Sequence, residues 1–274
     1  MSRAAVFPRE ARSILTPTGG YLAGFSHSLQ PYVGCEFDCR YCYVRELAVQ
    51  RANPHGLAWS RWIAPKSNAP ALLAARARGG GLRDLRIFCS SATDPYTPLE
   101  RRLGLTRGCL AVLACHPPAA LLLQTRSPLV VRDADLLAHI PSALVSMTVA
   151  TDDEAVRRAL EPNAPATRLR IEALARLRAA GVRTQAALSP LLPCDPERLA
   201  ELLDPHVERV VVDDFFQGDG AGGRRSGAAL ARLRELGFAA WTEPGYAAEA
   251  IVRLRRRLGP ERVLLSREGF AALP

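Results

Sequence analysis

The segment Pro31-Tyr-Val-Gly-Cys35-Glu-Phe-Asp-Cys39-Arg-Tyr-Cys42-Tyr43 places three of the chain's seven cysteines within eight residues. Their spacing is C-x3-C-x2-C. Three thiolates on one short loop can cap three corners of a [4Fe–4S] cube. The loop offers no fourth ligand, so one iron would keep an open position, as the metal does in a catalytic zinc site. The spacing predicts a [4Fe–4S] centre held by Cys35, Cys39 and Cys42.

Two other interpretations of this cluster stay open on the sequence alone. Structural zinc normally takes four ligands, and His55, thirteen residues after Cys42, is a candidate for the fourth. The chain would then be a non-catalytic zinc or iron–sulfur binding protein. The cysteines could also be unrelated buried residues. A ferredoxin-like carrier would need another cysteine nearby, and the remaining ones are distant: Cys89, Cys109, Cys115 and Cys194.

The length and composition favour one large domain. The chain has 274 residues, of which 48% are hydrophobic, and α/β barrels often exceed about 200 residues as a single unit. No apolar run is long enough to span a membrane, and Met1 to Glu10 lack the layout of a secretory signal. An odd number of cysteines without an export signal argues against a disulfide framework. We therefore expect a cytoplasmic protein with no membrane partner.

The chain is basic, with a formal net charge of +9. Such a charge can indicate a nucleic-acid partner. However, Lys66 is the only lysine, and frequent Ala, Leu, Arg and Pro are typical of a coding bias. Nucleic acid therefore remains a possible partner that the charge alone does not identify.

Short apolar runs alternate with longer helical patterns along the chain. Strands are expected near 22–29 and at 85–89, 120–124, 144–148, 184–188 and 209–213, and clear helices at 167–180, 195–203 and 227–236. Gly218 to Gly227 has the composition of a mobile loop. This alternation predicts a parallel sheet with right-handed crossovers, either open or curled into a barrel.

Polar residues follow the expected strands. The cysteine cluster follows the first strand, and Ser90–Asp94, Arg126, Thr148–Asp152 and Ser189–Pro190 follow the next four. In parallel α/β folds, reactive residues gather at the carboxyl ends of the strands. The sequence therefore predicts one functional site at that edge of the sheet.

The motif C-x3-C-x-aromatic-C, with Tyr41 as the aromatic, resembles the signature of the radical S-adenosylmethionine (SAM) superfamily. The resemblance implies an α/β fold, a partial (β/α)6 barrel with parallel strands. It also implies that the open iron binds SAM, that one electron cleaves the sulfonium to give a 5′-deoxyadenosyl radical, and that this radical abstracts hydrogen from a substrate. Tyr41 would lie beside the adenine. The reductant would be of the flavodoxin or ferredoxin type.

Further segments resemble the spore photoproduct lyase-like branch of that superfamily. Ser91–Glu100 resembles its T-D-P-Y-x-P-x-E block, Thr125–Asp133 a T-K-S…R-D segment, and Ser146–Arg170 an S-x-T…L-E-P…R segment. The similarity covers roughly residues 30–193. It implies a domain spanning 1–274, with a core of about 20–215 and a C-terminal α/β extension at 216–274.

The resemblance assigns the cofactor contacts by position. Arg126 stands where the family has a lysine that meets the SAM carboxylate, and a guanidinium can hold a carboxylate bidentately. Ser146 matches a serine that hydrogen-bonds SAM, and Ser91 and Thr93 lie where members contact the methionyl part.

Two residues are candidates for returning hydrogen to a product radical. The resemblance gives that role to Tyr43 and Cys89, although packing roles remain open for both. Cys89 is five residues before Asp94, whereas the lyase cysteine lies closer to its aspartate, which leaves the register uncertain.

Other residues have two readings each. Glu161 and Arg170 could contact the cofactor or pair with each other as a structural link, and Asp213–Asp214 could bind substrate or a cation, or cap a helix. Trp59 and Trp62 could stack on bases or pack in the core. The leading expectation is an enzyme with an unidentified substrate. The alternative is a nucleic-acid repair or modification enzyme related to the lyase.

Overall fold

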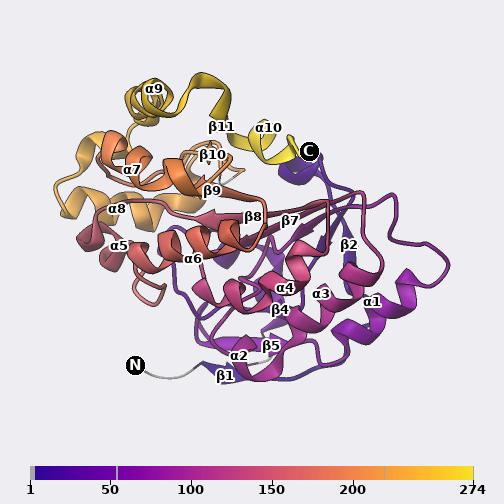
Figure 1. The fold of residues 1–274 in the computed structure, drawn as a ribbon. Coiled ribbons are helices and arrows are strands. Elements are labelled where there is room, and N and C mark those ends of the chain that lie inside the picture. Colours follow the sequence, from indigo (N-terminus) through magenta and orange to yellow (C-terminus); the bar gives the residue numbers. More distant parts are fainter. Residues whose placement is uncertain (1–3, 54, 219, 274) are drawn as a thin grey trace.

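The computed structural model describes residues 4–53, 55–218 and 220–273 (Figure 1). Within these residues the main sheet contains, in spatial order, β11 (Val263–Leu265), β10 (Arg209–Val212), β9 (Thr184–Leu188), β8 (Ala143–Thr148), β7 (Ala120–Thr125), β6 (Arg86–Cys89), β3 (His27–Leu29) and β2 (Leu15–Pro17). All neighbouring pairs are parallel except β2 with β3.

Helices alternate with these strands. They are α1 (Ala69–Ala77), α2 (Glu100–Leu103), α3 (Leu105–Cys115), α4 (Ala134–Ala138), α5 (Glu154–Leu160), α6 (Thr167–Ala179), α7 (Pro196–Leu203), α8 (Gly227–Glu235), α9 (Ala247–Leu258) and α10 (Ser266–Ala271). Strands β3, β6, β7, β8, β9 and β10 lie side by side in the sheet in the order in which they occur in the chain. From β6 onward, one or more helices connect each strand to the next. This arrangement confirms the predicted partial (β/α)6 barrel.

Local sequence explains where the helices begin. In α7, the Asp195 side chain accepts hydrogen bonds from the backbone N–H groups of Glu197 (3.1 Å) and Arg198 (3.3 Å). Pro196 occupies the first turn, where its missing N–H has no cost. Leu199 and Leu203 then face the core on one side of the helix.

The two faces of the main sheet are covered differently. One face packs against α1, α3, α4, α6, α7 and α9 in the largest apolar cluster. The opposite, inner face presents Phe88, Leu122 and Val211, which pack with Phe25 and Phe270. Because successive side chains of a strand point to opposite faces, adjacent residues of one strand belong to different environments.

Segments from both parts of the chain meet on this inner face. The 3-10 helix η1 (Gly20–Leu22) packs against α10, and the Arg86 guanidinium donates to the carbonyl of Ala271 at 2.8 Å. A Cβ added at Gly24 would lie 2.3 Å from the Cβ of Ala271. The approach is therefore possible only with glycine at that position.

A second, smaller sheet supports the cysteine segment. It orders β1 (Ala5–Val6), β5 (Trp62–Pro65) and β4 (Tyr32–Val33), with β1 parallel and β4 antiparallel to β5. Strand β4 leads directly into Gly34 and the first cysteine.

The structure differs from the sequence expectations at a few boundaries. The strand expected near 22–29 covers only His27–Leu29, because Leu22 belongs to η1. The loop expected at 218–227 contains a 3-10 helix, η6 (Arg224–Ser226), and its residue 219 lies outside the described residues. In the described part of the chain, no helix is both long and apolar enough to cross a membrane.

Candidate active site

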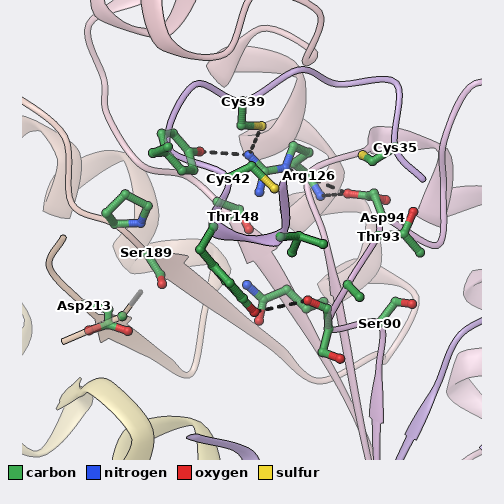
Figure 2. A pocket seen from close by; sticks show the side chains of 18 of the residues that line it. Cys35, Cys39, Cys42, Ser90, Thr93, Asp94, Arg126, Thr148, Ser189 and Asp213 are labelled. Atoms are coloured by element: carbon green, nitrogen blue, oxygen red, sulfur yellow. Dashed lines mark hydrogen bonds and ion pairs between the residues drawn. The ribbon is translucent and has the colours of Figure 1, made fainter. Parts of the chain in front are cut away.

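A cavity opens at the carboxyl ends of the parallel strands (Figure 2). Cys35, Cys39 and Cys42 line one side of it, and residues that end or follow β6 to β10 line the rest. The sequence prediction that the motif segments gather at this edge of the sheet is confirmed by their presence in one lining.

The conformation of the cysteine loop is stabilised by contacts to its backbone. Gly34 has a φ of +82°, and a Cβ there would lie 2.5 Å from the carbonyl oxygen of Trp62. The Thr93 hydroxyl donates to the carbonyl of Gly34. Arg45 donates to the carbonyl oxygens of Cys39 (2.6 Å) and Cys42 (3.2 Å). These contacts set the conformation of the cysteine loop.

Arg126, which follows β7, reaches the middle of the cysteine loop. Its Nη1 donates to Cys39 Sγ and to the Tyr41 hydroxyl, both at 2.8 Å, and to Glu161 Oε1 at 3.1 Å. Its Nη2 has no hydrogen-bond partner among the described residues, so two N–H donors remain for a ligand such as a carboxylate.

Glu161 is the centre of a buried charge network. It is fully buried and pairs with Arg126 and with Arg170, which is itself 1% exposed. Burial alone would raise the pKa of the Glu161 carboxyl, but the two guanidinium groups outweigh it and lower that pKa. Arg170 also donates to the carbonyl of Thr148 at 3.0 Å. The structural link between Glu161 and Arg170 that the sequence suggested is thus present.

Asp94 ties the ends of two strands together. Its carboxylate accepts hydrogen bonds from the Thr125 hydroxyl (2.7 Å), the Arg126 backbone N–H (2.8 Å) and the Tyr96 N–H (2.9 Å). Burial raises the pKa of Asp94, while these hydrogen bonds oppose the shift. Its oxygens are occupied by the protein, which indicates a role in positioning Arg126.

The lining of the cavity fits an iron–sulfur cluster together with a second, polar ligand. The three thiols are free of disulfides, and burial raises their pKa, to about 12 for Cys35, so metal binding would have to displace their protons. Gln124 Oε1 and Thr148 Oγ1 are buried, line the cavity and have no hydrogen-bond partner within the described part of the chain. Buried polar atoms are normally satisfied, which points to a ligand between these strand ends.

The geometry does not favour the zinc alternative. His55 is exposed and packs on the ring of Phe7, with 4.6 Å between ring centroids, and it does not line the cavity.

Five of the other predicted site residues line the cavity: Tyr41, Tyr43, Ser91, Thr93 and Arg126. The Tyr43 hydroxyl donates to the carbonyl of Ser91 at 3.2 Å, and burial raises the pKa of Tyr43 to about 12. Tyr41 donates to Glu161.

The structure places Cys89 and Ser146 outside the cavity. Cys89 is 1% exposed within the helix-covered face of the sheet, and its neighbour Phe88 lines the cavity instead, as the alternation along a strand requires. Ser146 is fully buried and accepts a hydrogen bond from Gln185 at 3.0 Å. Thr148, two residues further along the same face, lines the cavity where Ser146 was expected.

The paired residues after β10 separate in role. Asp214 accepts hydrogen bonds from the backbone N–H groups of Phe216 (2.8 Å) and Gln217 (2.6 Å), as a capping residue does. Both residues line the cavity, and Asp213 accepts a hydrogen bond from the Tyr21 hydroxyl. Sequence reasoning missed Tyr21 and Gln124, because neither belongs to a recognisable motif.

Trp59 and Trp62 are both buried, and Trp59 also lines the cavity. Trp59 and Trp62 form an edge-to-face pair with 6.2 Å between ring centroids, and Trp62 is fully buried. Trp62 cannot stack on a base in this position, so its core-packing role is confirmed.

A partial barrel with three cysteines at its carboxyl edge defines a class of enzyme that generates radicals from SAM. The sequence model of the radical SAM superfamily matches residues 29–204, and the chain belongs to this superfamily. Membership implies SAM cleavage and radical chemistry through an iron–sulfur cluster.

Relatives share the sequence over much of the chain. An uncharacterized protein of Methanocaldococcus jannaschii is 30% identical over 70% of this chain and 70% of its own length. An uncharacterized protein of Mycobacterium tuberculosis is 28% identical over 62% of this chain, and the match spans half of that relative's length.

Solved structures share the fold at low sequence identity. A spore photoproduct lyase mutant with bound AdoMet and dinucleoside spore photoproduct superimposes with a TM-score of 0.65 at 11% identity, covering 95% of this chain and 81% of the other. SuiB of Streptococcus suis bound to precursor peptide SuiA gives 0.51 at 14% identity, covering 97% and 49%. These likenesses show the fold.

Proposed function

We propose that the chain binds a [4Fe–4S] cluster through Cys35, Cys39 and Cys42 and uses it to cleave SAM, generating a radical that removes hydrogen from an organic substrate. The observation that carries this proposal is the cavity in which the three free thiols face two buried, unpartnered side-chain oxygens. The chemistry supplied by the bound cluster is the delivery of one electron to the SAM sulfonium. A flavodoxin or ferredoxin type of protein would serve as reductant.

The chain's own residues bind and orient the cofactors. Arg126 donates to Cys39, which would stabilise the thiolate, and its free Nη2 would hold the SAM carboxylate. Ser91 and Thr93 follow β6 at the same side of the cavity and are proposed to contact the methionyl part.

Residues at the middle of the cavity complete the proposed SAM site. Tyr41, fixed by Glu161, would lie beside the adenine, and the unpartnered oxygens of Gln124 and Thr148 would accept hydrogen bonds from SAM. The buried lining excludes water, which protects a reactive radical. Tyr43 is kept as a candidate hydrogen donor, whereas the position of Cys89 in the helix-covered core does not support that role.

We also propose that the chain forms one domain, with a core at about 20–215 and an extension at 216–274. Support comes from β11, which pairs with β10 in the main sheet, and from α10, which packs on β10.

The test is anaerobic reconstitution followed by dithionite and SAM. We expect about four iron per chain and formation of 5′-deoxyadenosine. Alanine at Cys35, Cys39 or Cys42 should abolish both, whereas Cys115→Ala, which changes an exposed cysteine, should abolish neither. A fully loaded cluster that yields no 5′-deoxyadenosine would contradict the proposal.

The salt dependence of binding would identify a nucleic-acid substrate. If DNA or RNA is bound through phosphate contacts, its affinity must fall steeply as salt rises. The net charge of +9 is the observation that favours this candidate. Weak, salt-independent binding would eliminate it.

A further inference from the structure

The wall of the cavity away from the cysteines carries a buried carboxylate that the proposed cofactor site does not use. Asp213 follows β10, is 4% exposed and lines the cavity. In the view of Figure 2 it lies across the cavity from Cys39, beyond Ser189. A group bound at Asp213 would therefore share the cavity with SAM without competing for the cysteine loop.

Neutral donors are the only hydrogen-bond partners of this carboxylate in the described chain. The Tyr21 hydroxyl donates to Oδ2, and the Asp214 backbone N–H donates to Oδ1 at 3.0 Å. No arginine, lysine or histidine of the described residues forms an ion pair with it. Burial raises the pKa of Asp213 to about 6, and hydrogen bonds from Tyr21, Ser266 and the Asp214 backbone oppose the shift. The carboxylate therefore has neutral partners but no ion-pair partner in the described part of the chain.

Aromatic rings line the same cavity as Asp213, and the ring of its partner Tyr21 lies 6.3 Å from the ring of Phe270 between centroids. Phe88 is 6% exposed and Phe270 is 4% exposed, and both line the cavity together with Tyr21. Burying an unpaired charge among apolar groups is costly. Both a carboxylate and the faces of aromatic rings attract a cation, so the missing partner is best supplied by a positively charged ligand.

A second observation indicates that a ligand enters this cavity. The hydroxyl of Thr148, a residue 1% exposed, is buried without a partner and lines the same space as Asp213. The side-chain oxygen of Gln124 is likewise unpartnered. These two oxygens are assigned to SAM above, so they indicate that the cavity takes up ligands. Neither can balance the charge of Asp213, which is left for a second ligand in the same cavity.

We propose that Asp213, together with the Tyr21 hydroxyl and the rings of Phe88 and Phe270, binds the protonated amino group of the substrate. The substrate class is then a primary or secondary amine attached to an apolar body. This inference rests on the proposed function, because it assigns the substrate side of the same cavity.

The test compares two probes of equal shape. Cluster-loaded enzyme with SAM and no reductant is titrated at pH 7.5 with 2-phenylethylammonium and with 2-phenylethanol, which lacks the charge. We expect the amine to bind at least tenfold more tightly than the alcohol. Asp213→Asn should reduce the preference to about twofold or less, whereas Asp135→Asn, at an exposed carboxylate on α4, should keep it.

Tyr21→Phe provides a second variant if Asp213→Asn does not fold. This substitution removes the hydroxyl that donates to Asp213 and keeps the ring. It should weaken amine binding at least threefold without changing the affinity for the alcohol. Equal affinities of wild type for the two probes, an amine preference above twofold at Asp213→Asn, or an unchanged amine affinity at Tyr21→Phe would overturn the inference. Formation of 5′-deoxyadenosine by wild type is measured separately, so the radical chemistry can stand while the amine site fails.

Discussion

Replacing Glu161 with glutamine should destabilise the protein strongly. The substitution keeps the size of the side chain but removes the negative charge between Arg126 and Arg170, which are 17% and 1% exposed as side chains. It also turns an amide N–H₂ toward guanidinium donors. Removing one partner of a buried ion pair costs about 3–5 kcal/mol. For a chain of this size that corresponds to a fall in Tm of about 6–10 °C.

The assay is thermal unfolding of wild type and Glu161→Gln with matched cluster content. Glu208→Gln is the control, because the Arg183–Glu208 pair is 40% and 33% exposed, and such pairs contribute at most about 1 kcal/mol. Equal Tm changes in the two variants would refute the reasoning that Glu161 neutralises buried charge.

The pH dependence of this difference has a defined sign. The folded protein lowers the pKa of Glu161, so its contribution is complete above the unfolded value of about 4.3 and is lost as the pH falls through the folded value. The gap in Tm between wild type and Glu161→Gln should therefore be full at neutral pH and narrow in acid. A gap that is constant down to about pH 3 would contradict the assignment.

Three further predictions follow from named positions. Gly34→Ala should lower Tm and iron content, because the added Cβ would meet the Trp62 carbonyl. Gly79→Ala is the control for backbone strain alone, because Gly79 has a similar φ but open space around it. Equal losses of Tm and iron content in the two variants would exclude the steric explanation. Burial raises the pKa of Asp213 from 3.8 to about 6, so the free energy of unfolding should fall by about 3 kcal/mol as the pH rises through that range; Asp213→Asn should remove this fall in pH-dependent melting, and an unchanged profile would contradict the shift. Cys89→Ala should cost about 1–2 kcal/mol by leaving a small cavity while keeping iron content and 5′-deoxyadenosine formation, and loss of either would restore Cys89 to the active site.

The cluster loop and the strand order could be predicted because their signals are local. The spacing of Cys35, Cys39 and Cys42 lies within eight residues, and each strand is a short apolar run followed by polar residues. Parallel strands that are neighbours in sequence are usually neighbours in space. The position of the site at one sheet edge followed from these two facts.

The facing of individual strand residues could not be predicted. Strands buried on both sides carry no polar and apolar alternation, so the sequence does not tell which of Phe88 and Cys89 points inward. A one-residue error reverses the face of a side chain. Ser146 and Thr148 share a face of β8, so a different uncertainty applies to them. The sequence does not tell how far along the strand the cavity begins.

Contacts between distant parts of the chain could also not be predicted from the sequence. Tyr21 and Asp213 are 192 residues apart in sequence, and neither has a motif that refers to the other. Phe270 enters the cavity lining from α10. Such pairings depend on how the final elements fold back over the inner face, which no periodicity encodes.

The position of Phe270 in the cavity wall has a consequence for the maturation of the protein. The thiols are synthesised early, and the roughly 230 residues between Cys42 and Phe270 take on the order of 10–50 s to translate. During that time the cysteine loop can be complete while the inner wall is still missing. The lining of the cavity is therefore complete only when nearly the whole chain has been made, because α10 supplies one of its side chains.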